Sequence, residues 1–145
     1  MKNKTIDYTL RATWQAVARM YNEEAAKYDA SMALAFGLLS IDREGTPSTL
    51  LGPNMGMEAT SLTRTLKKLE ENGLITKEKN PNDGRGVIIK LTPLGIEKRE
   101  LSKIKVKKFN EKIQSHISKE KIEHFFEVTE VINQLINDKV IFSNK

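Results

Sequence analysis

Two short segments of this chain carry the side chains best suited to chemistry. The first, residues 60–68, combines hydroxyl groups with cations, and its candidate residues are Thr60, Ser61, Thr63, Arg64, Lys67 and Lys68. The second, "KNPNDGR", supplies the candidates Lys79, Asp83 and Arg85. Hydroxyl, guanidinium and ammonium groups donate hydrogen bonds to phosphate oxygens and to base edges. These segments therefore predict binding of a polyanion.

The sequence lacks the usual patterns of an active site. The glycines of "GPNMG" (52–56) have neither the lysine nor the preceding strand of a phosphate-binding loop, and no nucleophile stands out beside a base. The two histidines, His116 and His124, lie near glutamates, but ordinary structural roles explain such histidines better than zinc ligation. We expect no enzyme, no catalytic residue, no metal and no cofactor.

Basic charge is concentrated in the middle of the chain. The whole chain has a formal charge of +5, whereas residues 61–108 hold 13 lysines and arginines against 6 acidic residues, a charge of +7 that leaves −2 elsewhere. A basic centre between nearly neutral ends is typical of a module that binds a polyanion. A solvated basic surface without a partner is the alternative.

The composition is that of a folded, helix-rich chain. It has 145 residues, of which 39% are hydrophobic and 30% charged, and this length suits one domain, residues 1–145. No apolar run approaches the roughly 18 residues of a membrane-spanning helix, and the start lacks the apolar centre of a secretory signal. The absence of cysteine excludes disulfides and thiolate zinc sites. We expect a cytoplasmic protein without a membrane partner.

Two helices are predicted at the N-terminus. Apolar residues recur at three- and four-residue spacing over residues 6–28, which indicates a long amphipathic helix. Residues 30–42 are apolar on nearly all sides, so we expect a buried helix with Asp29 or Ser31 as its cap.

A third helix and a fourth follow. Thr46 and Pro47 suit the cap and first position of the third, which Pro53 should end or kink because proline has no N–H to donate. The fourth covers residues 58–73 and should stop at Gly73. Its narrow apolar stripe consists of Leu62, Leu66 and Leu69.

A β-hairpin is predicted next, from two extended runs at residues 74–79 and 87–92. Two or three residues would reverse the chain, yet seven, 80–86, connect the runs and are rich in Asn, Gly and Pro. We expect a long tip that stands off the body. Thr92 then caps a helix reaching about Ile117, and Ser118 caps the last helix.

Short helix, turn, helix and hairpin together predict a winged helix-turn-helix. A helix fits the major groove of B-DNA, about 12 Å wide. Arg64 is the best candidate for a bidentate contact to guanine, or else for a phosphate clamp, while Lys67 and Lys68 should meet the DNA backbone. An ordinary amphipathic helix with a solvated polar face is the alternative.

The hairpin tip is expected in the adjacent minor groove. A narrow minor groove concentrates negative potential and attracts an arginine. Arg85 suits that role, and Asp83 would hold its guanidinium through a charge-assisted contact. The alternative is an exposed ion pair worth no more than ~1 kcal/mol and without function.

Residues 62–95, "LTRTLKKLEENGLITKEKNPNDGRGVIIKLTPLG", resemble the signature of the MarR family of bacterial winged-helix transcription regulators. The family's Leu-Glu-x-x-Gly-Leu-(Ile/Val) is matched by residues 69–75, its wing Asp-x-Arg by residues 83–85, and its Leu-Thr-x-x-Gly by residues 91–95. Thr63 and Arg64 match the family's usual pair on the recognition helix.

The resemblance implies a mainly α fold with a small β-hairpin wing, acting as a homodimer on double-stranded DNA. Residues 31–95 would be the winged helix-turn-helix core, and residues 1–28 and 96–145 the helical dimerisation region. Apolar stripes at both ends of the chain support dimerisation independently. Two-fold symmetry calls for a pseudo-palindromic operator with half-sites ~10 bp apart. Repression is the family's commoner outcome.

The chain also departs from the family pattern. Gly52 and Pro53 interrupt a helix that relatives keep whole, and no cysteine is present for peroxide sensing. Many relatives release DNA when a small aromatic or lipid-like anion binds. Apolar walls for such an effector could come from Trp14, Tyr21, Tyr28, Met32 and Phe36, with Arg11 or Arg19 pairing with the anion. Core or interface packing is the alternative role for these residues.

Two other readings of a winged helix remain open. It could be an adaptor that binds protein, or an architectural protein that binds DNA without sequence preference. Steep loss of affinity with added salt favours a DNA reader over an adaptor, because neutralised phosphates release counterions. Preference for a palindromic over a scrambled duplex excludes the architectural reading.

Overall fold

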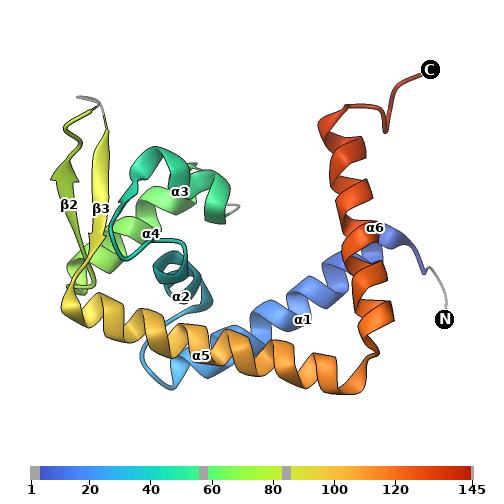
Figure 1. Cartoon of the computed structure of the whole chain (residues 1–145), viewed down its shortest axis with the longest axis horizontal. Coiled ribbons are helices and arrows are strands. Elements are labelled where there is room, and N and C mark those ends of the chain that lie inside the picture. The colour runs from blue at the N-terminus through green and yellow to red at the C-terminus, as the bar shows by residue number, and fades with distance from the viewer. Residues whose placement is uncertain (1–3, 56–58, 83–85, 145) are drawn as a thin grey trace. The chain divides into compact units, whose positions relative to one another are not determined.

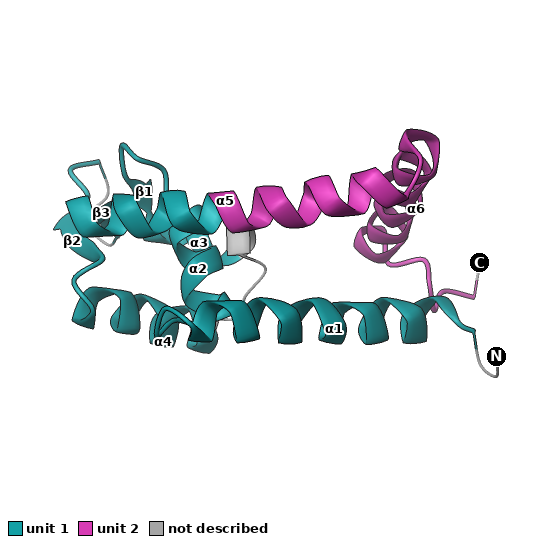
Figure 2. Ribbon diagram, turned by 90° about the horizontal axis from the view of Figure 1, so that it is seen from below, with its two compact units in different colours: residues 1–103 teal, residues 104–145 magenta. Residues whose placement is uncertain are grey.

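The computed structural model describes residues 4–55, 59–82 and 86–144, and it is mainly helical with one small antiparallel sheet (Figure 1). The expected fold class is confirmed. The chain divides into two compact units, Met1–Lys103 and Ile104–Lys145, and the boundary falls inside one long helix (Figure 2). The first unit holds the sheet and the candidate residues.

Within the described residues of unit 1, four helices and three strands precede the long helix. Their bounds are α1 Ile6–Ala26, α2 Met32–Leu39, β1 Thr46–Pro47, α3 Ser48–Met55, α4 Ala59–Glu71, β2 Ile75–Lys79 and β3 Val87–Leu91. The sheet order is β1-β3-β2, so β3 lies between the other two strands. The predicted hairpin is β2–β3, with Ile75 opposite Leu91 and Lys79 opposite Val87.

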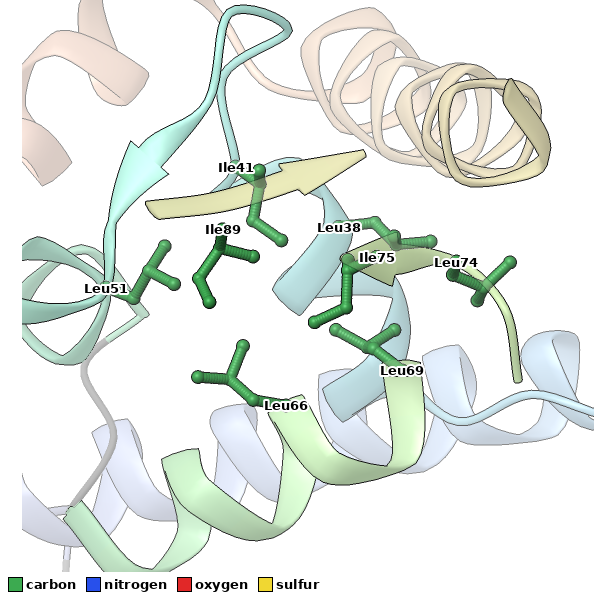
Figure 3. Close-up of a cluster of buried hydrophobic side chains, with 8 residues drawn as sticks. All are labelled: Leu38, Ile41, Leu51, Leu66, Leu69, Leu74, Ile75 and Ile89. Atoms are coloured by element: carbon green, nitrogen blue, oxygen red, sulfur yellow. The ribbon is translucent and has the colours of Figure 1, made fainter. Parts of the chain in front are cut away.

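One apolar cluster joins the elements of unit 1 (Figure 3). Its buried members are Leu38, Ile41, Leu51, Leu66, Leu69, Leu74, Ile75 and Ile89. They come from α2, α3, α4, β2, β3 and the connections between them, and each fully buried side chain of this size contributes about 1.5–3 kcal/mol. The cluster therefore fixes α4 and the base of the hairpin to a common support.

Several predicted helix ends are confirmed by backbone geometry. The hydroxyl of Ser31 accepts a hydrogen bond from the Leu34 N–H, so Ser31, and not Asp29, caps α2. Asp29 instead adopts a positive φ of 55° after α1. Gly73 has a φ of 73°, and the Leu74 N–H donates to the Leu69 carbonyl, which ends α4 in the manner of a Schellman motif.

The segment at Thr46 and Pro47 differs from the prediction. These two residues form strand β1, paired with Ile89 and Ile88 of β3, and α3 begins only at Ser48. The Thr46 side chain is buried, and its hydroxyl accepts a hydrogen bond from the Asp42 N–H at 2.8 Å instead of capping α3. Strand pairing with β3, and not helix capping, determines the conformation of Thr46 and Pro47.

Of the two expected effects of Pro53, an end or a kink of the helix, the end is not observed, because α3 continues to Met55. Leu51, two residues before the proline, is completely enclosed in the core and holds the helix in place. Proline removes one hydrogen bond from a helix interior. Burial of Leu51 offsets that loss. Helix α2 is shorter than the predicted 30–42, and only its end is buried, at Gly37 and Leu38.

Helix α5, Pro93–His116, crosses into unit 2, and α6 covers Lys119–Asn137. Ser118 caps α6 as predicted, because its hydroxyl accepts a hydrogen bond from the Lys121 N–H. Within unit 2, α6 exposes large apolar side chains on more than one face, including Phe125, Phe126, Val128 and Val131. No helix in the described part of the chain is long and apolar enough to cross a membrane.

Candidate nucleic-acid interface

Helix α4 separates its apolar residues from its candidate binding residues. Leu66 and Leu69 are buried and Leu62 packs against the core, whereas all six candidates, Thr60, Ser61, Thr63, Arg64, Lys67 and Lys68, are exposed. The helix thus has one face in the core and an outer face of hydroxyl and cationic groups. Such a face can donate hydrogen bonds to phosphates and base edges.

Thr65 is the residue of α4 that sequence reasoning missed. It is 7% exposed and lies on the core side, beside Leu66 and Leu69. Its position fits the helical period, since it is three residues from Leu62 and four from Leu69. The apolar stripe was read from leucines alone, although the spacing also places Thr65 in it.

Ion pairing divides the cations of this region into two groups. Lys77 Nζ lies 3.6 Å from Glu70 Oε1, and Lys90 Nζ lies 3.1 Å from Glu78 Oε2. In contrast, Arg64, Lys67, Lys68 and Lys79 are exposed and form no ion pair with any residue that the structure describes. The second group consists of the cations chosen from the sequence that the structure describes, and these charges are available to a polyanion.

The alternation of β2 turns Lys79 to the same side as α4. Ile75, Lys77 and Lys79 share one face of the strand, because side chains alternate along it. Ile75 enters the core, and Lys77 reaches Glu70 on α4, so this face is directed toward that helix. Lys79 lies one step further toward the tip on that face.

The described ends of the hairpin connection form a turn. The Asn80 N–H donates to the Gly86 carbonyl at 3.3 Å, and the Asn82 N–H donates to Asn80 Oδ1 at 3.0 Å, an Asx-type turn. The candidates Asp83 and Arg85 lie outside the described residues. Their roles in a minor groove stay predictions.

The base of the hairpin is tied to both neighbouring helices through Thr92. Its N–H donates to the Leu74 carbonyl at 3.0 Å, and its hydroxyl donates to the Gly73 carbonyl at 2.7 Å. The same hydroxyl accepts from the Gly95 N–H at 3.0 Å, which confirms Thr92 as the N-cap of α5. The sequence indicated the stop at Gly73 and the cap at Thr92 separately, without their contact.

The residues predicted for an effector pocket are only partly together. Tyr21 and Phe36 pack edge to face, with ring centroids 5.4 Å apart, and burial raises the pKa of the Tyr21 phenol. Met32 is partly buried, and its N–H donates to Asn22 Oδ1 at 2.9 Å, which ties α2 to α1. Trp14 and Tyr28 remain 55% and 47% exposed. The predicted pocket residues thus form one packed pair, Tyr21 and Phe36, and two exposed aromatic side chains. The effector role stays a prediction.

No group of three or more His, Asp or Glu side chains within the described ranges is placed to hold a metal ion. His116 Nδ1 lies 3.0 Å from the Lys112 carbonyl and 3.0 Å from Ser115 Oγ. These contacts belong to the end of α5 and need no ion to explain them.

Comparisons with known proteins agree with this geometry. The model of the MarR family matches residues 36–87, which include α3, α4 and β2. A relative from Bacillus subtilis (strain 168), an uncharacterized HTH-type transcriptional regulator called YdgJ, is 27% identical over 88 residues, 61% of this chain. That match spans about half the length of the relative, 54%.

Solved structures extend the similarity to nearly the whole chain. The MepR–DNA complex of S. aureus matches with a TM-score of 0.81 and 18% identity, covering 92% of this chain and all of that one. A cysteine-to-serine mutant of MarR from E. coli, complexed with operator DNA, matches with a TM-score of 0.77 and 22% identity over 88% of this chain and 92% of that one. Family model, relative and fold agree with the residue signature, and the chain is similar in sequence and in fold to MarR family transcription regulators.

Proposed function

We propose that this chain is a sequence-specific regulator of transcription that binds double-stranded DNA as a homodimer and acts as a repressor. The observation that carries the proposal is the outer face of α4. There Arg64, Lys67 and Lys68 are exposed and have no ion pair within the described residues, while the opposite face is fixed in the core. A rigid helix with free cations suits the major groove.

The wing supplies a second contact in this proposal. Lys79 faces the α4 side of the hairpin, where it would meet a phosphate of the same duplex. Arg85 would enter the neighbouring minor groove, held by Asp83. The MepR and MarR structures of similar fold are complexes with DNA, which makes DNA the first partner to test.

The exposed apolar residues of α1 and of α6 support the homodimer. Trp14 in α1 and Phe126 and Val131 in α6 are all more than half exposed. Each helix by itself presents more apolar surface to water than a monomeric protein usually does. A second copy of the chain would cover these residues, and its symmetry gives a pseudo-palindromic operator with half-sites ~10 bp apart.

An effector of the small aromatic or lipid-like anionic class would act by releasing the DNA. The pair Tyr21–Phe36 offers an apolar wall at the contact between α1 and α2. Arg11 and Arg19, on α1, would supply the cation that such an anion needs.

The experiment that tests the function is selection of bound duplexes from a random pool with the full chain, followed by salt titration of the winning sequence. We expect enrichment of a pseudo-palindrome whose affinity falls steeply with salt. Equal binding of scrambled duplexes would indicate architectural binding, and absence of binding to any duplex would favour a protein adaptor. Repeating the selection with aromatic and fatty acids tests release.

A further inference from the structure

Three segments meet at the base of the wing: the end of α4, the start of β2 and the start of α5. The turn from α4 into β2 has only three residues, Asn72, Gly73 and Leu74, because α4 ends at Glu71 and β2 begins at Ile75. Thr92 binds the carbonyls of the last two, Gly73 through its hydroxyl and Leu74 through its N–H. A change in the direction of the hairpin relative to α4 has to strain or break one of these bonds.

The hydroxyl of Thr92 both donates and accepts a hydrogen bond at this junction. A hydroxyl has one hydrogen, which goes to the Gly73 carbonyl, and its oxygen accepts the Gly95 N–H at the first turn of α5. One side chain thus links the C-terminus of α4 to the N-terminus of α5.

Gly95 brings α5 into direct contact with the same turn. A Cβ atom on Gly95 would collide with the Leu74 carbonyl oxygen, so no other residue fits without movement of the backbone. Gly95 is buried. The junction is therefore packed as well as hydrogen-bonded, and Thr92 is its polar centre.

Small rotations at this junction become large displacements at the wing tip. Strand β2 has five residues, and at about 3.3 Å per residue a rotation of roughly 10° at its base would move its end by roughly 3 Å. A hydrogen bond or phosphate contact is lost over a smaller distance than that. Lys79 stands at this far end.

We propose that Thr92 is a positioning residue that fixes the wing relative to α4, so that helix and wing meet their grooves of one duplex together. The effect of Thr92 on the position of the wing is inferred from the junction geometry alone. Its consequence for DNA binding rests on the proposed function.

The first test measures wing position without DNA. Because the chain has no cysteine, spin labels attach only at introduced sites, here Ser61→Cys on α4 and Asn82→Cys on the wing. We expect one narrow distance distribution in the parent and with Thr92→Ser, which keeps the hydroxyl. Thr92→Val, of similar shape but without the hydroxyl, should broaden or shift it. An unchanged distribution in Thr92→Val overturns the proposal.

The second test measures coupling to DNA with double mutants on the selected operator. Lys79→Ala should weaken binding by roughly 5–10-fold in the parent, the value of about one phosphate contact near 0.1 M salt. In the Thr92→Val background, Lys79→Ala should reduce the affinity at most about twofold, because the wing no longer holds Lys79 against the phosphate. The cost of Lys67→Ala, on α4, should be equal in both backgrounds. Equal costs of Lys79→Ala in both backgrounds contradict the proposal.

If Thr92→Val does not fold, Thr92→Asp takes its place as the test variant. Its carboxylate still accepts the Gly95 N–H and caps α5, but it has no hydrogen for the Gly73 carbonyl. Leu94→Asp, on an exposed neighbour, adds the same charge with the hydroxyl intact and controls for repulsion of DNA. We expect Thr92→Asp to broaden the label distances and Leu94→Asp to leave them unchanged. If the parent binds no duplex, the proposed function fails while the label distances still decide the role of Thr92.

Discussion

Arg64 differs from Arg99 in its surroundings. Arg99 is only 17% exposed at its side chain, and its Nε donates to the Ile41 carbonyl at 3.0 Å. Arg64 is exposed and has no such partner within the described residues. Arg99 therefore stabilises the fold, whereas the guanidinium of Arg64 is available to bind a ligand.

Replacing Arg64 with alanine should weaken operator binding by about 1–3 kcal/mol and relax preference at one base pair per half-site, if the guanidinium contacts guanine. Binding of a full set of single-base operator variants measures this. Lys77→Ala is the matched control. Because Lys77 is paired with Glu70, its replacement should reduce operator affinity little. Uniform weakening over all operator variants would assign Arg64 to a phosphate instead.

Gly95→Ala should lower the free energy of unfolding by about 1–3 kcal/mol, because the new methyl group collides with the Leu74 carbonyl. Gly73→Ala is the contrast: open space surrounds its position, but its φ of 73° costs an alanine about 1 kcal/mol. Chemical denaturation of both variants measures the difference. A Gly95→Ala variant as stable as the parent would contradict the close approach of α5.

At the scale of elements, the sequence predicted the order of helices and strands well, because the periodicity of apolar residues is local information. The stripe of Leu62, Leu66 and Leu69 located α4, and the β-branched run of Val87, Ile88 and Ile89 located β3. The outer face of α4 followed from the same pattern, so its candidate residues are exposed as expected.

Errors arose where distant parts of the chain decide the local structure. Thr46 and Pro47 looked like the start of a helix, but they pair with β3, some forty residues away in the chain. Helix α3 passes Pro53 because Leu51 is held in the core. The link from Thr92 to Gly73 likewise spans the whole wing. Spacing along the sequence contains none of these contacts.

The length of the wing connection, residues 80–86, should affect the affinity for DNA. Replacing residues 80–86 by Asn-Gly would close the hairpin in a two-residue turn and remove its tip. We expect this variant to keep its thermal stability, since none of the described connection residues, 80–82 and 86, belongs to the buried cluster, and to lose affinity most on operators with A·T-rich flanks.

Arg85→Ala should reproduce most of that loss with the tip length intact. Competition between A·T-flanked and G·C-flanked operators is the measurement for both variants. Equal losses on the two flanks would reject a role for the wing in the minor groove.

At the scale of the whole molecule, large apolar residues of α6 are exposed, and a second copy of the chain would cover them in the proposed homodimer. Val131→Glu should raise the dissociation constant of the dimer at least about tenfold, because a carboxylate in an apolar interface loses its hydration. Sedimentation over a range of concentrations measures it, and Glu130→Gln, one residue away, is the control. A Val131→Glu chain that dimerises as tightly as the parent would place the interface elsewhere.

The most direct test of the account is hydroxyl-radical footprinting of the full chain on its selected duplex, with the stoichiometry taken from sedimentation. We predict two protected regions ~10 bp apart, related by two-fold symmetry, with two chains on one duplex. Each region should contain a major-groove segment lost in Arg64→Ala and a flanking minor-groove segment lost in Arg85→Ala. A single protected region, or one chain for each duplex, would contradict the account.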